Sequence, residues 1–253
     1  MNLDYKICNI LTKKEVSHLR EKLDKSKGWS DGSESTIGYD AGIKNNEEQY
    51  RSDPKNEIFK YRQSIGHRYL DLEEPYKFTT AKSVTLPIIS QMKKGGFYKP
   101  HIDTPLLGQY STTLFLSEPD EYEGGELLLH IGGSTKKVKL SAGKAIIYKS
   151  GTPHCVNEVL NGKRIVSVCW IKSLITNQYD RELIYMLRVL GQELNNKYGD
   201  FNDGCQKKYW HTLDSAMSDP YFMLKNISHY IESKYPDQET DHLQEGEPGF
   251  YLK

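Results

Sequence analysis

The sequence has few cysteines, no excess of charge of either sign and no long apolar run. Its four cysteines, Cys8, Cys155, Cys169 and Cys205, are scattered without a C-x-x-C pair, which excludes a zinc knuckle and a disulfide scaffold. The 34 basic and 34 acidic residues cancel, and no stretch concentrates Lys and Arg, so we expect no nucleic-acid surface. No window holds about 18 successive apolar residues, and the N-terminus does not resemble a leader. We therefore expect a cytoplasmic, non-membrane protein with reduced thiols, Cys155 and Cys169 lying in or near its core.

Helical patterns lie at both ends of the chain. Thr12 and Glu15 form a capping box, and apolar residues at helical spacing predict a helix over 13–26. Apolar residues recur every three or four positions from Ile58 to Leu72 and predict a second amphipathic helix. After the middle of the chain, further helices are expected over 179–194 and 221–235. Leu183, Met186, Leu187, Leu190 and Leu194 form a stripe that we expect to face a core.

The middle of the chain has a β pattern. Short apolar runs, separated by Gly-rich turns at spacings of about ten residues, predict a sandwich or barrel. The runs cover 84–92, 111–116, 126–131, 136–140, 145–148, 155–160 and 165–171. The fold class is therefore α+β, mainly β. We divide the chain into helical support (1–80), a β core (81–175), a helical extension (176–235) and a loose acidic tail (236–253).

Three residues of this β region predict a metal site. His101 and Asp103 are two positions apart, so on a strand they would share a face. His154, from later in the chain, would complete a set of two histidines and one carboxylate. This set is typical of non-heme Fe(II) oxygenases, in which it leaves open coordination positions for a co-substrate and O2. Each residue also has a structural interpretation, since His-x-Asp arises readily by chance and a lone histidine is often a core or loop residue.

The segment HIDTPLLGQYSTTLFLSEPDEYEGGELLLHIGGSTKKVKLSAGKAIIYKSGTPHCVNEVLNGKRIVSVCWIKS resembles the core of the PKHD-type hydroxylases. These are Fe(II)/2-oxoglutarate-dependent dioxygenases related to prolyl 4-hydroxylases. The resemblance spans roughly residues 10 to 190 and includes Lys44 to Asn46. It implies a double-stranded β-helix (jelly roll), with His101, Asp103 and His154 as iron ligands. It further implies that Arg164 binds the distal carboxylate of 2-oxoglutarate and that ascorbate is an accessory cofactor.

The chemistry of arginine agrees with that role. Arg164 offers a planar fork that stays charged when it is buried, although an arginine next to Lys163 could also be a surface residue. Trp170 shares strand parity with Arg164 and should face the same site, as a core aromatic would. Thr113 and Tyr98 are hydroxyl-bearing candidates for further co-substrate contacts.

The chain departs from the family pattern at two places. Nine residues before the first ligand, the family often has a tyrosine that can bond the co-substrate, and this chain has Met92. The segment from Leu106 to Tyr110 lacks the Arg and Asp that the family commonly carries there. The hydrogen bond to the co-substrate must therefore come from another residue or be absent. The substrate can also differ from those of the family.

One local signal conflicts with the site. Asn161-Gly162 is typical of a two-residue hairpin turn, and regular pairing across it would put His154 and Arg164 on opposite faces. A bulge between Cys155 and Val159, or irregular chain at His154, would reconcile the two.

Three functions from different classes are compatible with these residues. The first is a hydroxylase that consumes 2-oxoglutarate and O2, releases succinate and CO2, and oxidises a C–H bond. Its substrate would be a peptidyl (for example prolyl) residue, a free amino acid or a small molecule. The second is a metal-dependent hydrolase with the same ligands, and the third is a jelly-roll binding protein without catalysis. The sequence does not indicate the oligomeric state.

Overall fold

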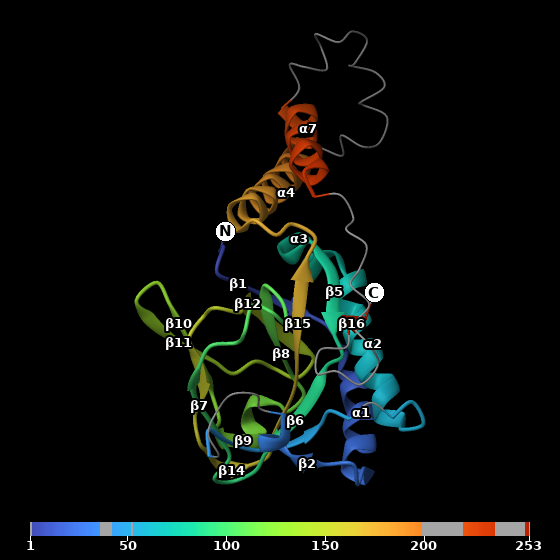
Figure 1. Ribbon diagram of the computed structural model, residues 1–253, viewed down its shortest axis with the longest axis vertical. Coiled ribbons are helices and arrows are strands. Elements are labelled where there is room, and N and C mark those ends of the chain that lie inside the picture. Colours follow the sequence, from blue (N-terminus) through green and yellow to red (C-terminus); the bar gives the residue numbers. More distant parts are fainter. Residues whose placement is uncertain (1, 36–41, 52, 199–219, 236–250, 253) are drawn as a thin grey trace. The chain divides into compact units, whose positions relative to one another are not determined.

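The structure is a computed structural model, in which the described residues form two compact units (Figure 1). It describes residues 2–35, 42–51, 53–198, 220–235 and 251–252. The larger unit contains the described residues of Asn2–Tyr76 and Ala81–Ser173 and the strand at 251–252; the smaller contains Lys77–Thr80 and the described residues between Leu174 and residue 235. Within these ranges no helix is both long enough and apolar enough to cross a membrane. The division into four segments remains a prediction.

A large antiparallel sheet forms one layer of the larger unit. Its strands are β1 (Tyr5–Asn9), β2 (Ser30–Asp31), β4 (Glu47–Gln49), β5 (Ala81–Thr85), β6 (Ile88–Met92), β8 (Tyr110–Phe115), β12 (Lys144–Lys149), β15 (Arg164–Ser173) and β16 (Tyr251–Leu252). The main path runs β1-β12-β8-β15-β6-β4-β2, and β5 pairs with β15 and β16. Because side chains alternate along a strand, Arg164, Val166, Val168 and Trp170 of β15 share one face.

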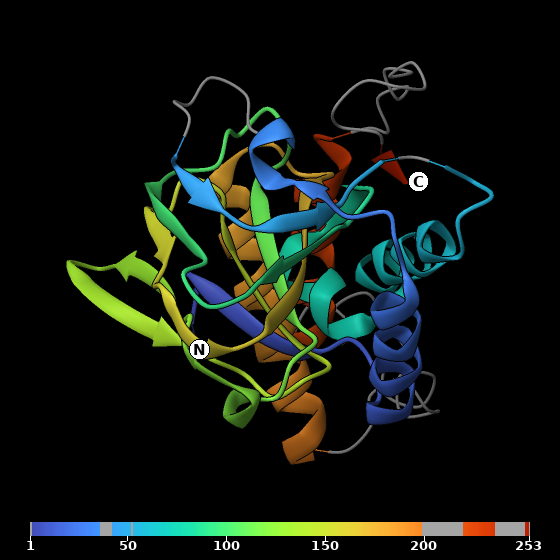
Figure 2. The ribbon, with the colours of Figure 1, turned by 90° about the horizontal axis from the view of Figure 1, so that it is seen from below.

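A smaller sheet and a two-stranded ladder complete the β structure. The sheet runs β11-β10-β13-β7-β3 and the ladder pairs β14 with β9. Their bounds are β3 (Lys44–Asn45), β7 (Phe97–His101), β9 (Tyr122–Gly124), β10 (Leu127–Ile131), β11 (Ser134–Val138), β13 (His154–Val156) and β14 (Val159–Gly162). Figure 2 shows the β10–β11 hairpin extending from this layer.

Side chains from both sheets and from the ladder pack into one core. This inner core contains Met92, Phe115, Tyr122, Leu127, Leu129, Val138, Ile146, Tyr148, Val156, Val159 and Val166, all buried. A fully buried aliphatic or aromatic side chain contributes about 1.5–3 kcal/mol, so this cluster is a main source of stability. Two antiparallel sheets that share a core form the jelly roll that the sequence predicts.

Helices cover the other face of the large sheet. They are α1 (Lys13–Lys25) and α2 (Glu57–Asp71), and α2 contacts β5. Helix α3 (Glu73–Thr79) is divided between the two units, and short 3-10 turns lie at Gly32–Ser35 and Pro119–Glu121. The predicted capping box is present: Thr12 Oγ1 accepts from Glu15 N, and Glu15 Oε2 accepts from Thr12 N at 2.7 Å. Such a cap is worth about 1 kcal/mol. Tyr69 of α2 is fully buried and its hydroxyl lies next to Thr112 of β8, on the face opposite Thr113.

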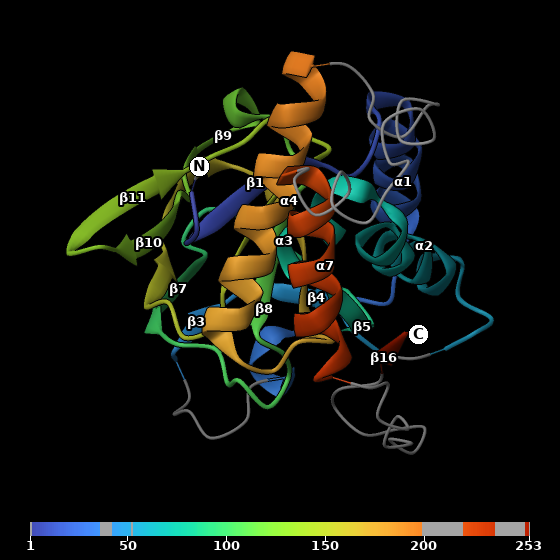
Figure 3. The ribbon, with the colours of Figure 1, turned by 90° about the horizontal axis from the view of Figure 1, so that it is seen from above.

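The smaller unit consists mainly of α4 (Gln178–Tyr198) and α7 (Pro220–Ser233), which lie side by side (Figure 3). Ile175, Ile184 and Ile231 form its core, and Leu187 packs against them. The predicted apolar stripe on α4 is therefore only partly correct. Leu183 and Leu190 are exposed, because Ile184 rather than Leu183 faces α7.

The sequence-based elements differ from the structure at several points. The expected strand over 84–92 is two strands, β5 and β6, because Pro87 interrupts the ladder. The expected strand over 155–160 is likewise divided between β13 and β14, which belong to different layers. Strand β1 and helix α3 were not predicted. The expected acidic tail lies almost entirely outside the described residues, and Cys205 lies outside them too.

The described cysteines are free thiols, as predicted. Cys8 and Cys169 are buried, and Cys155 is half-buried. Burial raises the pKa of Cys8 and of Cys169 to about 12, because a thiolate would lose its hydration there. Both thiols therefore act as small core side chains.

Candidate metal and anion site

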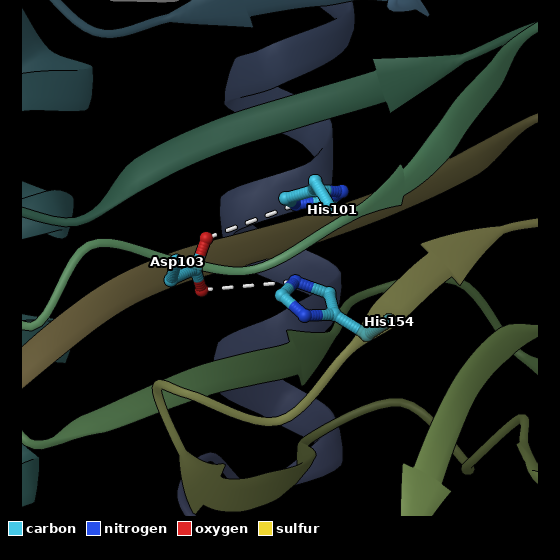
Figure 4. Close-up of side chains that lie close together, drawn as sticks. All are labelled: His101, Asp103 and His154. Carbon is cyan, nitrogen blue, oxygen red and sulfur yellow. Dashed lines mark ion pairs between the residues drawn. The ribbon is translucent and has the colours of Figure 1, made fainter.

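Two neighbouring strands of the smaller sheet bring the two histidines together. His101 ends β7, His154 begins β13, and the two residues are direct partners in the ladder. Their ring centroids are 4.1 Å apart. Asp103 lies in the extended chain just after β7, and its carboxylate reaches the gap between the imidazoles (Figure 4). The ligand atoms of the three residues all lie within 4.8 Å of one another.

The orientation of both imidazoles suits a metal ion. Asp103 Oδ1 lies 3.7 Å from His101 Nε2, and Oδ2 lies 3.7 Å from His154 Nε2, too far for direct hydrogen bonds. His101 Nδ1 is 2.8 Å from the Lys99 carbonyl, and His154 Nδ1 is 2.9 Å from the Thr152 carbonyl. A carbonyl can only accept, so each Nδ1 carries a proton and each Nε2 is the ring atom that faces the carboxylate.

Burial keeps the first histidine neutral. The pKa of His101 is lowered to about 4, mainly because burial penalises the imidazolium and also because His154 is adjacent. The Lys99 carbonyl and Asp103 act in the opposite direction but do not overcome burial. At neutral pH the lone pair of His101 is therefore available to a cation.

Two serines hold the carboxylate, and sequence reasoning missed both. Ser111 Oγ donates to Asp103 Oδ2 at 2.6 Å and lies 3.0 Å from Ser150 Oγ. The backbone N–H of Asp103 also donates to the Ser150 carbonyl at 3.2 Å. Serine at the start of a strand carries no metal-site signal, and only the fold brings Ser111 and Ser150 to Asp103.

Arg164 forms a second, cationic part of the site. It begins β15 on the inner face of the large sheet and is only 2% exposed. Its Nε has no hydrogen-bond partner among the described residues, none of whose carboxylates forms an ion pair with it. Its surroundings are aromatic: the guanidinium carbon lies 5.7 Å from the Phe115 ring centroid, with Tyr122 and Tyr148 also nearby. Burial lowers the pKa of Arg164, and the two tyrosines partly oppose this lowering.

Tyr148 connects the metal and the cationic ends. Its ring packs edge-on to His154 with centroids 5.2 Å apart. Burial raises the pKa of its hydroxyl, and the charges of both Asp103 and Arg164 act on it. Tyr148 thus lies close to both the carboxylate–histidine cluster and the guanidinium.

The predicted hairpin at Asn161-Gly162 is wrong. Strand β14 pairs with β9 instead of folding back on β15, with Gly162 opposite Tyr122. His154 therefore belongs to the smaller sheet and Arg164 to the large sheet. Both can face the shared interior, so the parity conflict does not arise. Of the two reconciling alternatives, irregular chain at His154 is also wrong, because His154 is in β13.

The remaining predicted residues lie around this site. The Tyr98 ring stacks on His101 with centroids 3.8 Å apart and planes inclined by 17°. Thr113 contacts the Tyr148 hydroxyl. Trp170 is the ladder partner of Ser111, and its Nε1 is a buried donor without a partner among the described residues. Met92 is the ladder partner of Arg164 and packs in the inner core.

A buried ion pair lies behind Tyr98. Lys44 Nζ is 2.9 Å from Glu48 Oε1 and 5.3 Å from the centroid of the Tyr98 ring. Asn46 Nδ2 donates to the same Glu48 oxygen at 2.7 Å and to Ser90 Oγ at 2.8 Å. The sequence indicated Lys44 to Asn46 only through the family resemblance. The structure shows that this segment supports the ring stacked on His101.

Sequence comparisons identify similar proteins. The family model of the 2OG-Fe(II) oxygenase superfamily matches residues 87–172. A PKHD-type hydroxylase of Prochlorococcus marinus (strain NATL2A) is 34% identical over 202 residues, which cover 78% of this chain and 90% of that protein. A PKHD-type hydroxylase of Shewanella baltica (strain OS155) is 31% identical, covering 72% of this chain and 83% of that protein.

Solved structures with the same fold include two prolyl hydroxylases. A Pseudomonas putida prolyl-4-hydroxylase superposes with a TM-score of 0.50 at 18% identity, covering 67% of this chain and 92% of that chain. A Trichoplax adhaerens prolyl hydroxylase, in complex with a hypoxia inducible factor peptide fragment, gives a TM-score of 0.53 at 17% identity over 68% and 84%. These similarities confirm the jelly-roll core.

Proposed function

Because the chain belongs to the PKHD-type hydroxylases and is thus a 2-oxoglutarate-dependent dioxygenase, we propose that it hydroxylates a C–H bond with release of succinate and CO2. The C–H bond would belong to a peptidyl residue, a free amino acid or a small molecule. The family uses Fe(II), 2-oxoglutarate and O2. In this proposal, bound Fe(II) and 2-oxoglutarate supply the oxidising chemistry, and the protein supplies binding and orientation.

His101, Asp103 and His154 are the proposed iron ligands. Two Nε2 lone pairs and one carboxylate converge within a spacing that an ion at about 2.0–2.2 Å from each ligand can bridge with small side-chain shifts. A bound Fe(II) would supply the binding of a chelating oxo acid and of O2, and these three residues would hold it. The carbonyls of Lys99 and Thr152 orient the imidazoles, and Ser111 orients the carboxylate.

The buried guanidinium of Arg164 is the main observation that supports binding of 2-oxoglutarate. A cation at 2% exposure, with an Nε lacking a partner and no carboxylate paired to it in the described chain, is costly unless an anion joins it. The distal carboxylate of 2-oxoglutarate would supply that anion while its oxo acid end reaches the metal. A metal-dependent hydrolase has no comparable use for Arg164.

Tyr98, Thr113 and Trp170 are proposed to line the co-substrate and substrate side of the site. Tyr98 packs flat against a proposed ligand, and Trp170 offers an unpartnered N–H next to Ser111. Thr113 acts on Tyr148. Ascorbate as an accessory cofactor and a cytoplasmic location stay predictions from the sequence.

A peptidyl residue, prolyl in particular, is the first substrate class to test, because structures of prolyl hydroxylases share the fold and one of them holds a peptide. The test incubates the Fe(II)-loaded protein with 2-oxoglutarate and candidate peptides, amino acids and small molecules. It measures a mass gain of one oxygen atom together with equimolar succinate. Turnover of any substrate without 2-oxoglutarate, or with Zn(II) in place of Fe(II), would contradict the proposal.

A further inference from the structure

Tyr122 is brought to Arg164 by the β9–β14 ladder. Tyr122 begins β9, its direct partner in β14 is Gly162, and Arg164 follows Gly162 by two residues. The approach is close, since a Cβ at Gly162 would lie 2.8 Å from Tyr122 Cα and 2.1 Å from the Glu121 carbonyl oxygen. A glycine is therefore required opposite the tyrosine, and the fold places a phenol beside the first residue of β15.

The Tyr122 hydroxyl lies in the inner core beside the Arg164 guanidinium. The residue is 5% exposed, and since a guanidinium can only donate, the phenol O–H finds no acceptor among the described residues. It is near enough to Arg164 for each group to influence the pKa of the other. Leaving a buried O–H without an acceptor is unfavourable, because the hydrogen bond it made to water is not replaced. Two adjacent buried donors, the Arg164 Nε–H and the Tyr122 O–H, thus lack an acceptor.

We propose that the Tyr122 hydroxyl donates, together with Arg164, to the distal carboxylate of bound 2-oxoglutarate. This inference rests on the proposed function. A carboxylate has two oxygens with about four acceptor positions, so one group can satisfy both donors. Met92 and Phe115, which also lie beside Arg164, carry no donor. Tyr122 would thus supply the hydroxyl that the family resemblance expects at the position of Met92.

Tyr148 is a different case and provides a comparison. Its hydroxyl contacts Thr113, and its ring packs against His154. It therefore lies toward the metal end of the site and already has a polar neighbour. Tyr122, by contrast, has the Arg164 guanidinium as its polar neighbour, which cannot accept the proton of the hydroxyl.

The experiment compares two oxo acids that differ only at the distal carboxylate, 2-oxoglutarate and 2-oxopentanoate. Binding of each to the Fe(II)-loaded protein is measured without O2 in the wild type and in Tyr122→Phe. The substitution removes one oxygen and keeps the ring. We expect 2-oxoglutarate to bind about 10- to 100-fold more weakly, the loss of a hydrogen bond to a charged group, and 2-oxopentanoate to bind unchanged. The melting temperature of the metal-free variant should change little, because the removed O–H has no acceptor there.

Tyr69→Phe is the matched control. It also removes a buried hydroxyl, but next to Thr112 on the opposite face of the large sheet, so both oxo acids should bind as to the wild type. The ratio of the two affinities in one preparation is independent of how much protein is folded. Equal 2-oxoglutarate binding by the wild type and Tyr122→Phe, or an equal loss for both acids, would overturn the inference. Failure of the wild type to bind 2-oxoglutarate would instead reject the proposed function.

Discussion

Lys44 and Glu48 form an ion pair in which only 5% of each side chain is exposed. Glu48 also accepts from Asn46 and from Ser35 Oγ, the latter at 2.5 Å. A buried carboxylate with three donors is stable only while the positive partner remains, because desolvation of an unpaired charge is costly. The pair therefore holds strand β3 in place beside Tyr98 of β7. Because the Tyr98 ring stacks on His101, the pair also helps to position His101.

Lys44→Met should lower the free energy of unfolding by about 3 kcal/mol or more, because Glu48 is left buried and unpaired. Lys44→Met combined with Glu48→Gln should recover part of that loss. Lys25→Met breaks the exposed pair with Glu21 and should change stability by less than about 1 kcal/mol. Urea unfolding of the four proteins measures these differences, and equal effects of the Lys44 and Lys25 substitutions would contradict the argument.

Gly162→Ala should destabilise the protein more than Gly133→Ala. Both glycines have a φ of +77°, so both substitutions incur the strain of the left-handed region, on the order of 1 kcal/mol. A Cβ at Gly133 meets nothing within 4 Å, whereas at Gly162 it meets the Glu121 carbonyl. The difference between the free energies of unfolding of the two variants therefore measures the cost of the close approach of β14 to β9. Equal losses would show that the ladder can relax.

Arg164→Met should weaken 2-oxoglutarate binding by about 2–5 kcal/mol, the usual effect of truncating one partner of a buried charge pair. Fe(II) binding should change little, because the guanidinium is not among the proposed ligands. Calorimetric titrations of each ligand, without O2, separate the two effects. Parallel loss of both affinities would indicate a structural role for Arg164.

Asp103→Ala should abolish Fe(II) binding and succinate production while the protein stays folded. It removes the only proposed anionic ligand, and two imidazoles rarely retain Fe(II) against competing chelators. His101→Ala and His154→Ala should behave alike. Metal content after dialysis and circular dichroism of each variant check this, and wild-type turnover by any one of them would remove that residue from the ligand set.

The metal-free protein should lose stability as the pH falls from about 6.5 to about 4. The folded-state pKa of His101 is about 4 against an ordinary value of 6.5, so in this window the unfolded chain binds a proton that the folded protein does not. Proton linkage then lowers the free energy of unfolding by up to about 3 kcal/mol across this pH window. His101→Asn should show a shallower dependence in thermal melts at each pH. An unchanged slope would mean that other groups govern the acid limb.

Much of the site could be predicted because it depends on local patterns and on residue types with few alternative roles. His101, Asp103, His154 and Arg164 were identified from spacing and family resemblance, and the first three lie together as expected. The capping box of Thr12 and Glu15 was readable because it is complete within four residues. These features need no knowledge of distant contacts.

The pairing of β14 could not be predicted, because its local and long-range signals disagree. Asn161-Gly162 favours a two-residue hairpin on its own, but Gly162 is needed opposite Tyr122, forty residues earlier in the chain. Ser111 and Ser150 were missed for a similar reason: each looks like an ordinary strand or turn serine until the sheets assemble. Long-range pairing therefore determined what the local patterns left undecided.

The second histidine and the arginine, only ten residues apart in the chain, project from opposite walls of the sandwich. Facing sheets lie about 10 Å apart, and that gap, rather than the intervening chain, sets how far the two ends of the site are separated. The two sheets thus hold the two ends of the site at a set separation. If Arg164 binds the distal carboxylate as proposed, residues added between His154 and Arg164 would leave the length of the accepted dicarboxylate unchanged, whereas a bulkier side chain in the inner core would change it.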